Sequence, residues 1–148
     1  MTDLRELYQE VIFDHNRKPR NFGPLPGANR CAEGFNPLCG DKLKLYLKVE
    51  DGVIQDAHFE GIGCAIATAS ASLMTECLIG KTEAEAGALF DKFRQMVTNP
   101  PMETCSELGK LSVLGGVREF PARVKCATLA WHTLHAALHQ ETQSVSTE

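Results

Sequence analysis

KLKLYLKVEDGVIQDAHFE, residues 42–60, is the stretch of the chain that decides its fold. Over residues 43–49, leucines and a valine alternate with lysines and a tyrosine, which is the pattern of a strand with one buried and one solvated face. Glu50-Asp51-Gly52 is a turn sequence, and residues 53–60 alternate again. We therefore expect an antiparallel hairpin, joined by a third, shorter strand near residues 28–36.

Helical patterns lie on both sides of this hairpin. Asp3 and Glu6 form a capping box ahead of apolar residues at helical spacing, and Pro19 ends that helix. Further helices are expected over about residues 64–79, 82–97, 106–114 and 121–139. The predicted fold class is α+β, with a small antiparallel three-stranded sheet packed by about five to six helices.

Length and composition predict one domain, residues 1–140, followed by a polar, frayed C-terminal tail, residues 141–148. A net charge of −4, with no basic stripe and no interleaved aromatic residues, argues against nucleic-acid binding. The N-terminus lacks the apolar core of a signal peptide, and the most apolar run, residues 62–74, is too short and too polar to span a membrane. We expect a cytoplasmic, reducing location, where six cysteines are more plausibly metal-binding or catalytic than disulfide-bonded.

Asn36-Pro37-Leu38-Cys39-Gly40-Asp41 is the strongest candidate for a functional site. Side chains two positions apart in an extended chain point to the same side, so Cys39 and Asp41 can converge on one atom. Cys64 follows Gly61-Ile62-Gly63 at an expected helix start, where backbone N–H groups lower the pKa of a thiol. Cys126 lies early in the last helix, on the shoulder of its buried side. Three thiolates and a carboxylate are a ligand set that zinc accepts.

The other cysteines have weaker settings. Cys77 falls among apolar residues late in a helix and is most simply a small core residue. Cys105 follows a proline break and is the best reserve ligand, while Cys31 precedes the key loop and could be a neighbour of the site. The chain has no Cys-x-x-Cys pair, which argues against zinc ribbons and thioredoxin-like motifs.

The histidines are interpreted as structural or solvated. His15 ends the first helix, where the helix dipole favours a cation. His58 is expected on the solvated face of the sheet. At 100° per residue, His132, His135 and His139 share an outward face of the last helix, away from Cys126.

Several motifs together resemble the IscU/NifU-like family of iron–sulfur cluster assembly proteins. Within that family the chain is most similar to the SufU type, because Lys125 stands where scaffold-type members carry a histidine and because the segment from Cys64 to Cys126 is longer. The resemblance covers about residues 3–138. The motifs that carry it are Asp14-His15, Pro19-Arg20-Asn21-Phe22, Asn36–Asp41, Gly61–Ile66, Ala69–Ser72 and Pro121–Cys126.

The resemblance implies a small antiparallel sheet covered by helices, and zinc bound by Cys39, Asp41, Cys64 and Cys126. It implies further that the protein takes persulfide sulfur from a SufS-type cysteine desulfurase and hands it to a downstream cluster-assembly scaffold. Cys39 would be the sulfur acceptor.

Elementary chemistry is compatible with these roles. Four anionic ligands outweigh a divalent ion, so cations nearby would offset the excess charge, and Arg123 and Lys125 flank Cys126. Our hypothesis is that Cys39, once released from the metal, attacks the persulfide while Arg123 stabilises the displaced Asp41. The loops at residues 23–28, 61–63 and 121–125 should form the rim around Cys39.

Three functions remain open at this point. The first is a zinc-dependent sulfurtransferase. The second is a scaffold on which an iron–sulfur cluster is assembled, with Cys39, Cys64 and Cys126 holding iron or the cluster. The third is a zinc-stabilised interaction module, which the size of the chain and the absence of Cys-x-x-Cys pairs disfavour.

Overall fold

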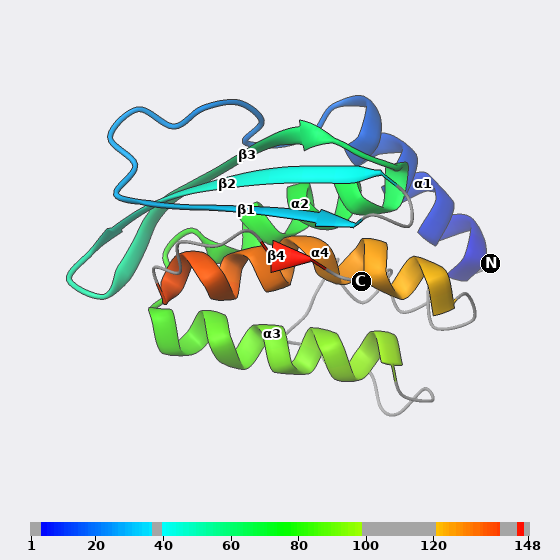
Figure 1. Ribbon diagram of the computed structural model, residues 1–148. Coiled ribbons are helices and arrows are strands. Elements are labelled where there is room, and N and C mark those ends of the chain that lie inside the picture. Colours follow the sequence, from blue (N-terminus) through cyan, green and yellow to red (C-terminus); the bar gives the residue numbers. More distant parts are fainter. Residues whose placement is uncertain (1–3, 37–39, 99–120, 140–144, 147–148) are drawn as a thin grey trace.

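The computed structural model shows a sheet with helices packed on one of its faces (Figure 1). The structure describes residues 4–36, 40–98, 121–139 and 145–146. The predicted three-stranded antiparallel sheet is confirmed. Its strands are β1 (Arg30–Asn36), β2 (Asp41–Glu50) and β3 (Val53–Ile62).

A fourth short strand comes from the C-terminal tail. Residues Val145–Ser146 form β4, which pairs in parallel with Gly34 and Phe35 of β1, so the strand order is β3-β2-β1-β4. The prediction of a frayed tail was therefore wrong for these two residues. Their pairing partner lies more than a hundred positions earlier in the chain, and no local pattern announces such a contact.

The described part of the chain holds four helices, where about five to six were predicted. They are α1 (Leu4–Arg17), α2 (Ala65–Leu78), α3 (Glu83–Thr98) and α4 (Pro121–Leu138). The helix expected over residues 106–114 lies outside the described residues. Among the described helices, none is long and apolar enough to cross a membrane.

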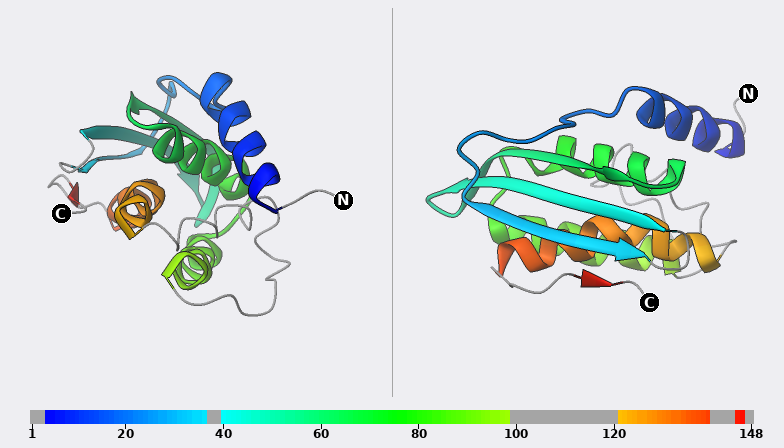
Figure 2. Two further views of the ribbon diagram at one scale, coloured as in Figure 1. Left: turned by 90° about the vertical axis from the view of Figure 1, so that its right-hand side faces the viewer. Right: turned by 45° about the horizontal axis from the view of Figure 1, so that its top comes forward.

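The helices form layers beneath the sheet, as the end-on view in Figure 2 shows. Helices α2 and α4 pack on the buried face of the sheet, α3 packs on the far side of α4, and α1 packs against α2. The alternation in β2 explains this arrangement, because Leu45 and Leu47 are fully buried. The residues that alternate with them, Lys44, Tyr46 and Lys48, lie on the other face of the sheet and are only half-buried. Trp131 of α4 stacks on Phe93 of α3 with ring centroids 4.7 Å apart, which joins the outer layer to the core.

Gly34 allows α4 to lie close to β1. A Cβ atom at this position would overlap the hydroxyl oxygen of Thr133 and would lie 3.1 Å from a methyl carbon of Leu129. Glycine therefore fits here because a helix approaches the strand directly.

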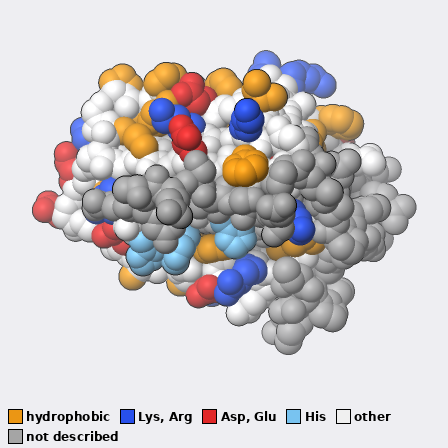
Figure 3. Space-filling view, in the orientation of Figure 1, with side chains coloured by type: hydrophobic (Ala, Val, Ile, Leu, Met, Phe, Trp, Pro, Cys, Tyr) orange, Lys and Arg blue, Asp and Glu red, His pale blue; other side chains and the backbone are white. Residues whose placement is uncertain are grey.

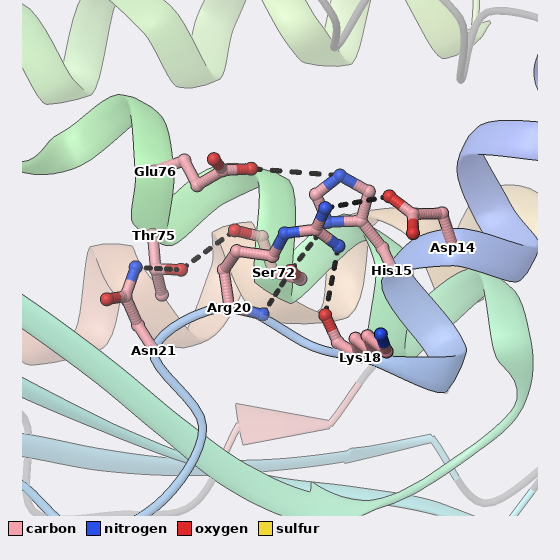
Figure 4. Close-up of polar contacts among 8 residues, drawn as sticks. All are labelled: Asp14, His15, Lys18, Arg20, Asn21, Ser72, Thr75 and Glu76. Atoms are coloured by element: carbon pink, nitrogen blue, oxygen red, sulfur yellow. Dashed lines mark hydrogen bonds and ion pairs between the residues drawn. The ribbon is translucent and has the colours of Figure 1, made fainter.

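His15 lies in the last turn of α1, as predicted, but it is buried between α1 and α2, which the prediction missed. The His15 side chain is 1% exposed, and its Nδ1 lies 2.6 Å from the hydroxyl oxygen of Ser72 (Figure 4). The backbone N–H of Arg20 donates to the same hydroxyl oxygen at 2.8 Å. His15 Nε2 lies 3.7 Å from a carboxylate oxygen of Glu76. These contacts hold α1 and the segment that follows it against α2.

The remaining histidines follow the prediction only in part. His58 is half-buried, with Nδ1 3.3 Å from the carbonyl oxygen of Pro24. His132 is also half-buried and meets the ring of Phe90 edge-on at 5.2 Å. His135 and His139 are exposed as expected, and histidine side chains gather on the surface below the sheet in Figure 3.

Candidate metal centre

Three segments meet where β1 gives way to β2. These are the first residue of β2, the N-terminus of α2 and the first turns of α4. They lie at the right-hand end of the sheet in Figure 1. The side chains brought together there are those of Asp41, Cys64 and Cys126.

The spacing of these three side chains suits a tetrahedral metal ion. One ligand atom from each residue lies within 4.8 Å of the other two. Cys64 Sγ lies 3.8 Å from Asp41 Oδ2. Zinc–sulfur and zinc–oxygen bonds of ordinary length place two tetrahedral ligands about 3.6 Å apart. Asp41, Cys64 and Cys126 therefore fit three corners of a zinc site with small adjustments.

Asp41 is held in place by the chain that follows β3. Its carboxylate is 1% exposed, and the backbone N–H of Cys64 donates to Oδ1 at 2.8 Å. A Cβ atom at Gly63 would lie 3.1 Å from the same oxygen, so glycine leaves just enough room for the carboxylate. One oxygen of Asp41 thus orients the carboxylate while the other faces the Cys64 sulfur.

Cys64 is the N-cap of α2. Its sulfur accepts a hydrogen bond from the backbone N–H of Ala67 at 3.4 Å, which is the geometry of a capping side chain. The pKa of Cys64 is lowered to about 6, chiefly through its hydrogen bond with Cys126 and further through the backbone N–H of Ala67. Burial and the Asp41 carboxylate oppose this shift. The helix N-terminus contributes as expected, but the neighbouring thiol contributes more.

Cys126 lies deeper than its position on the helix suggested. It is fully buried, and its sulfur accepts a hydrogen bond from Asn36 Nδ2 at 3.5 Å. Asn36 was quoted in the motif without a role. No local pattern revealed it, because Asn36 shares a buried face with Asp41 only through the pairing of β1 with β2.

The fourth expected ligand, Cys39, lies outside the described residues, as does the reserve ligand Cys105. The two ends of the Cys39 loop are described, and Gly40 N donates to the carbonyl oxygen of Asn36 at 2.8 Å. Gly40 has φ +72°, a conformation that suits glycine. The backbone of Arg123 belongs to the first turn of α4, but its side chain lies outside the described residues, while Lys125 is exposed.

The other expected neighbours of the site lie elsewhere. Cys31 is exposed on β1, five residues before Asn36, so it is not adjacent to the ligands. Cys77 is half-buried against the core, as predicted.

The loop at residues 23–28 was wrongly predicted to form the rim of the site. At the start of the loop, the backbone N–H of Gly23 donates to the carbonyl oxygen of Phe59 in β3. Just after the loop, the N–H of Asn29 donates to the carbonyl oxygen of Leu47, near the end of the sheet where β2 turns into β3. The loop therefore runs away from the ligands.

A family model described as the NifU-like N terminal domain matches residues 7–127. The chain belongs to this family. The resemblance inferred from the motifs is confirmed at that level.

Two relatives with named functions align with most of this NifU-like chain. The iron–sulfur cluster assembly scaffold protein IscU of Streptococcus pyogenes serotype M1 is 42% identical over 93% of this chain and 86% of its own length. The zinc-dependent sulfurtransferase SufU of Bacillus subtilis (strain 168) is 40% identical over 94% of both chains. The two names differ in function, although the identities are nearly equal.

Solved structures share the fold of this NifU-like chain. A crystal structure from Fervidobacterium islandicum AW-1, described as a scaffold for iron–sulfur cluster assembly in the SUF system, has a TM-score of 0.83 and 36% identity. It covers 89% of this chain and 96% of that one. The N-terminal part of a NifU-like protein from Brucella abortus has a TM-score of 0.81 and 26% identity, over 93% and 96% of the two chains.

Proposed function

We propose that this protein is a zinc-dependent sulfurtransferase of iron–sulfur cluster assembly, which accepts persulfide sulfur from a SufS-type cysteine desulfurase. The observation that carries the proposal is the convergence of Asp41, Cys64 and Cys126 at the base of the Cys39 loop. The zinc-dependent relative from Bacillus subtilis, which aligns over 94% of this chain, supports it.

The residues themselves fit zinc in number and kind. Two thiols and a carboxylate at tetrahedral spacing leave one corner, which Cys39 would fill. The lowered pKa of Cys64, about 6, makes it a thiolate at neutral pH, the form that binds metal. Bound zinc would keep its thiol ligands deprotonated.

Sulfur transfer then requires only that one cysteine thiolate replaces another as the partner of the persulfide sulfur. The Cys39 thiolate attacks the terminal sulfur of the desulfurase persulfide and forms a new S–S bond. The S–S bond of the desulfurase breaks, and its cysteine leaves as a thiolate. No electrons are gained or lost overall, and the product is a persulfide on Cys39 for a downstream cluster-assembly scaffold. Arg123, at the start of α4, is proposed to stabilise Asp41 during this step.

A second candidate function is that of the scaffold itself. The Streptococcus pyogenes relative carries that name at 42% identity, and thiolates also bind iron–sulfur clusters. In this case Cys39, Cys64 and Cys126 would hold the cluster. The presence of the buried Asp41 carboxylate beside the two thiols, with 3.8 Å between Asp41 Oδ2 and Cys64 Sγ, favours a single zinc ion as the resident group.

Metal content and persulfide mapping together test the proposal. Protein purified without air is assayed for zinc, iron and acid-labile sulfide. It is then incubated with a SufS-type desulfurase and cysteine, and the persulfide is located by mass spectrometry. Cys39→Ala should retain the fold and accept no sulfur. Cys31→Ala is the matched control, because Cys31 is an exposed thiol away from the ligands.

The outcomes separate the two functions. One zinc per chain, no sulfide and a persulfide on Cys39 support the sulfurtransferase. Iron and sulfide in near-equal amounts support the scaffold. Normal sulfur acceptance by Cys39→Ala would overturn the proposed role of Cys39 as the sulfur acceptor.

A further inference from the structure

Asn36 occupies an unusual place for an amide side chain. It is the last residue of β1 and pairs directly with Asp41, the first residue of β2. Directly paired residues project from the same face of a sheet. Both side chains are buried, Asn36 at 0% exposed and Asp41 at 1%. Burial of an amide is costly unless it is hydrogen-bonded, so the partners of Asn36 are informative.

One partner is a sulfur atom of the candidate metal centre. Asn36 Nδ2 donates to Cys126 Sγ at 3.5 Å, and Cys126 is itself fully buried. A buried thiolate is stabilised by an N–H donor, which takes the place of the water it has lost. Cys64 has an equivalent donor in the backbone N–H of Ala67.

The backbone of Asn36 has a second contact. Its carbonyl oxygen accepts the N–H of Gly40 and thereby closes the loop that carries Cys39. Asn36 therefore touches one candidate ligand through its side chain and anchors the loop of another through its backbone.

We propose that Asn36 is a positioning residue for the metal thiolates, a role that rests on the proposed function. Its carboxamide directs the Cys126 sulfur toward Asp41 and Cys64. The same hydrogen bond lowers the electron density on that sulfur, so Cys126 remains a ligand and does not become the site of sulfur transfer. A merely structural asparagine would close the loop through its backbone and have no effect on the metal.

The most direct test detects this hydrogen bond in the metal-loaded, unaltered protein. The metal is replaced by cadmium-113, the protein is labelled with nitrogen-15, and a scalar coupling is sought between the cadmium and the Asn36 amide protons through the sulfur. A measurable coupling is expected. Bound cadmium without that coupling would overturn the inference and leave the proposed function intact. Failure to bind cadmium at all would overturn both.

A pair of matched variants tests the consequence for affinity. Asn36→Leu keeps the backbone bond to Gly40 and removes the side-chain donor. Outer-shell partners typically change metal affinity 10–100-fold, so zinc affinity measured by competition with a chelator should fall by about that factor. The cobalt-substituted variant should also show its sulfur-to-cobalt absorption at longer wavelength.

The control variant is Asn29→Leu. Asn29 bonds through both ends of its amide to the backbone of Val49, near the hairpin end of the sheet. It should lose stability and keep its zinc affinity and cobalt spectrum. A folded Asn36→Leu variant with unchanged affinity and spectrum would overturn the inference. If that variant does not fold, the cadmium coupling in the unaltered protein decides.

Discussion

The two carboxylate oxygens of Asp41 face two different atoms of Cys64, its backbone nitrogen and its sulfur. Oδ1 accepts the backbone N–H of Cys64 at 2.8 Å, and Oδ2 lies 3.8 Å from its sulfur. One carboxylate therefore ties the start of β2 to the N-cap of α2 and remains available to a metal. Residues 23 positions apart in the chain become neighbours through this single contact.

Removing the carboxylate of Asp41 should separate its two roles. Asp41→Asn keeps an oxygen for the Cys64 N–H but loses the charge, and Asp41→Ala loses both. We expect zinc affinity to decrease in the order wild type, Asp41→Asn, Asp41→Ala. The alanine variant should lose roughly 100-fold or more, since even outer-shell partners contribute 10–100-fold. Chelator competition measures this.

Asp56→Asn is the control for the Asp41 variants, because Asp56 also accepts a backbone N–H, that of Ala57, but lies away from the centre. Its zinc affinity should be that of wild type. Equal affinities for wild type and Asp41→Ala would remove Asp41 from the ligand set.

The thiol of Cys64 should react at unusually low pH in the zinc-free protein. Because its pKa is lowered to about 6, iodoacetamide labelling of Cys64 should be half-maximal near that pH. In the urea-unfolded chain the midpoint should be about 8.5. Mass spectrometry of the Cys64 peptide measures both, and a folded-state midpoint near the unfolded one would refute the shift.

The same pKa shift predicts how the stability of the zinc-free protein depends on pH. Between about 6 and about 8.5 the unfolded thiol binds a proton that the folded one does not. The stabilisation is therefore complete above the unfolded pKa and is lost as the pH falls through the folded pKa. Urea unfolding at several pH values should show this trend, and Cys64→Ala should weaken it.

Gly63 should be needed for the metal centre more than for the fold. An added Cβ would lie 3.1 Å from Asp41 Oδ1 and 3.4 Å from the Cβ of Ala67, so the carboxylate must shift. We expect Gly63→Ala to lower zinc affinity about tenfold, the lower end of the effect of an outer-shell change.

Gly87→Ala is the matched control, since a Cβ there would meet no atom within 4 Å. It should stabilise α3 by about 0.5–1 kcal/mol and leave zinc affinity unchanged. If Gly63→Ala binds zinc as wild type does, the carboxylate does not need its present position.

The contact between His15 and Ser72 should be worth a measurable coupling free energy. Ser72→Ala removes the partner of both the His15 ring and the Arg20 N–H, so it should cost about 1–3 kcal/mol of unfolding free energy. With His15→Phe in a double-mutant cycle, the coupling should be about 0.5–3 kcal/mol. Urea denaturation supplies the four free energies.

The control for this cycle is His58→Phe, which makes the same substitution at a half-buried histidine of β3 whose ring contacts the carbonyl oxygen of Pro24. It should be additive with Ser72→Ala to within about 0.3–0.5 kcal/mol. Additivity of His15→Phe with Ser72→Ala would show that the observed contact stabilises little.

Local patterns predicted the elements that local physics controls. The alternation in residues 43–49 predicted β2, because a strand with one buried face must alternate. The helix expected from residue 64 and the strand expected near residues 28–36 also lie where they were predicted. The environment of His15 was missed because Ser72 lies 57 residues away, and β4 was missed because its partner strand β1 is even more remote in the chain.

The sequence by itself determined the identity of the candidate ligands and the elements that carry them, since residue type and short-range periodicity are local properties. The tertiary structure decided which of them meet. The pairing of Asn36 with Asp41 and the packing of α4 under β1 bring Cys126 beside both, and the N-cap position directs Cys64 toward the same point. Convergence of this kind depends on strand register and helix packing, which arise from contacts distant in the chain, and for that reason the donor from Asn36 to Cys126 became visible only in three dimensions.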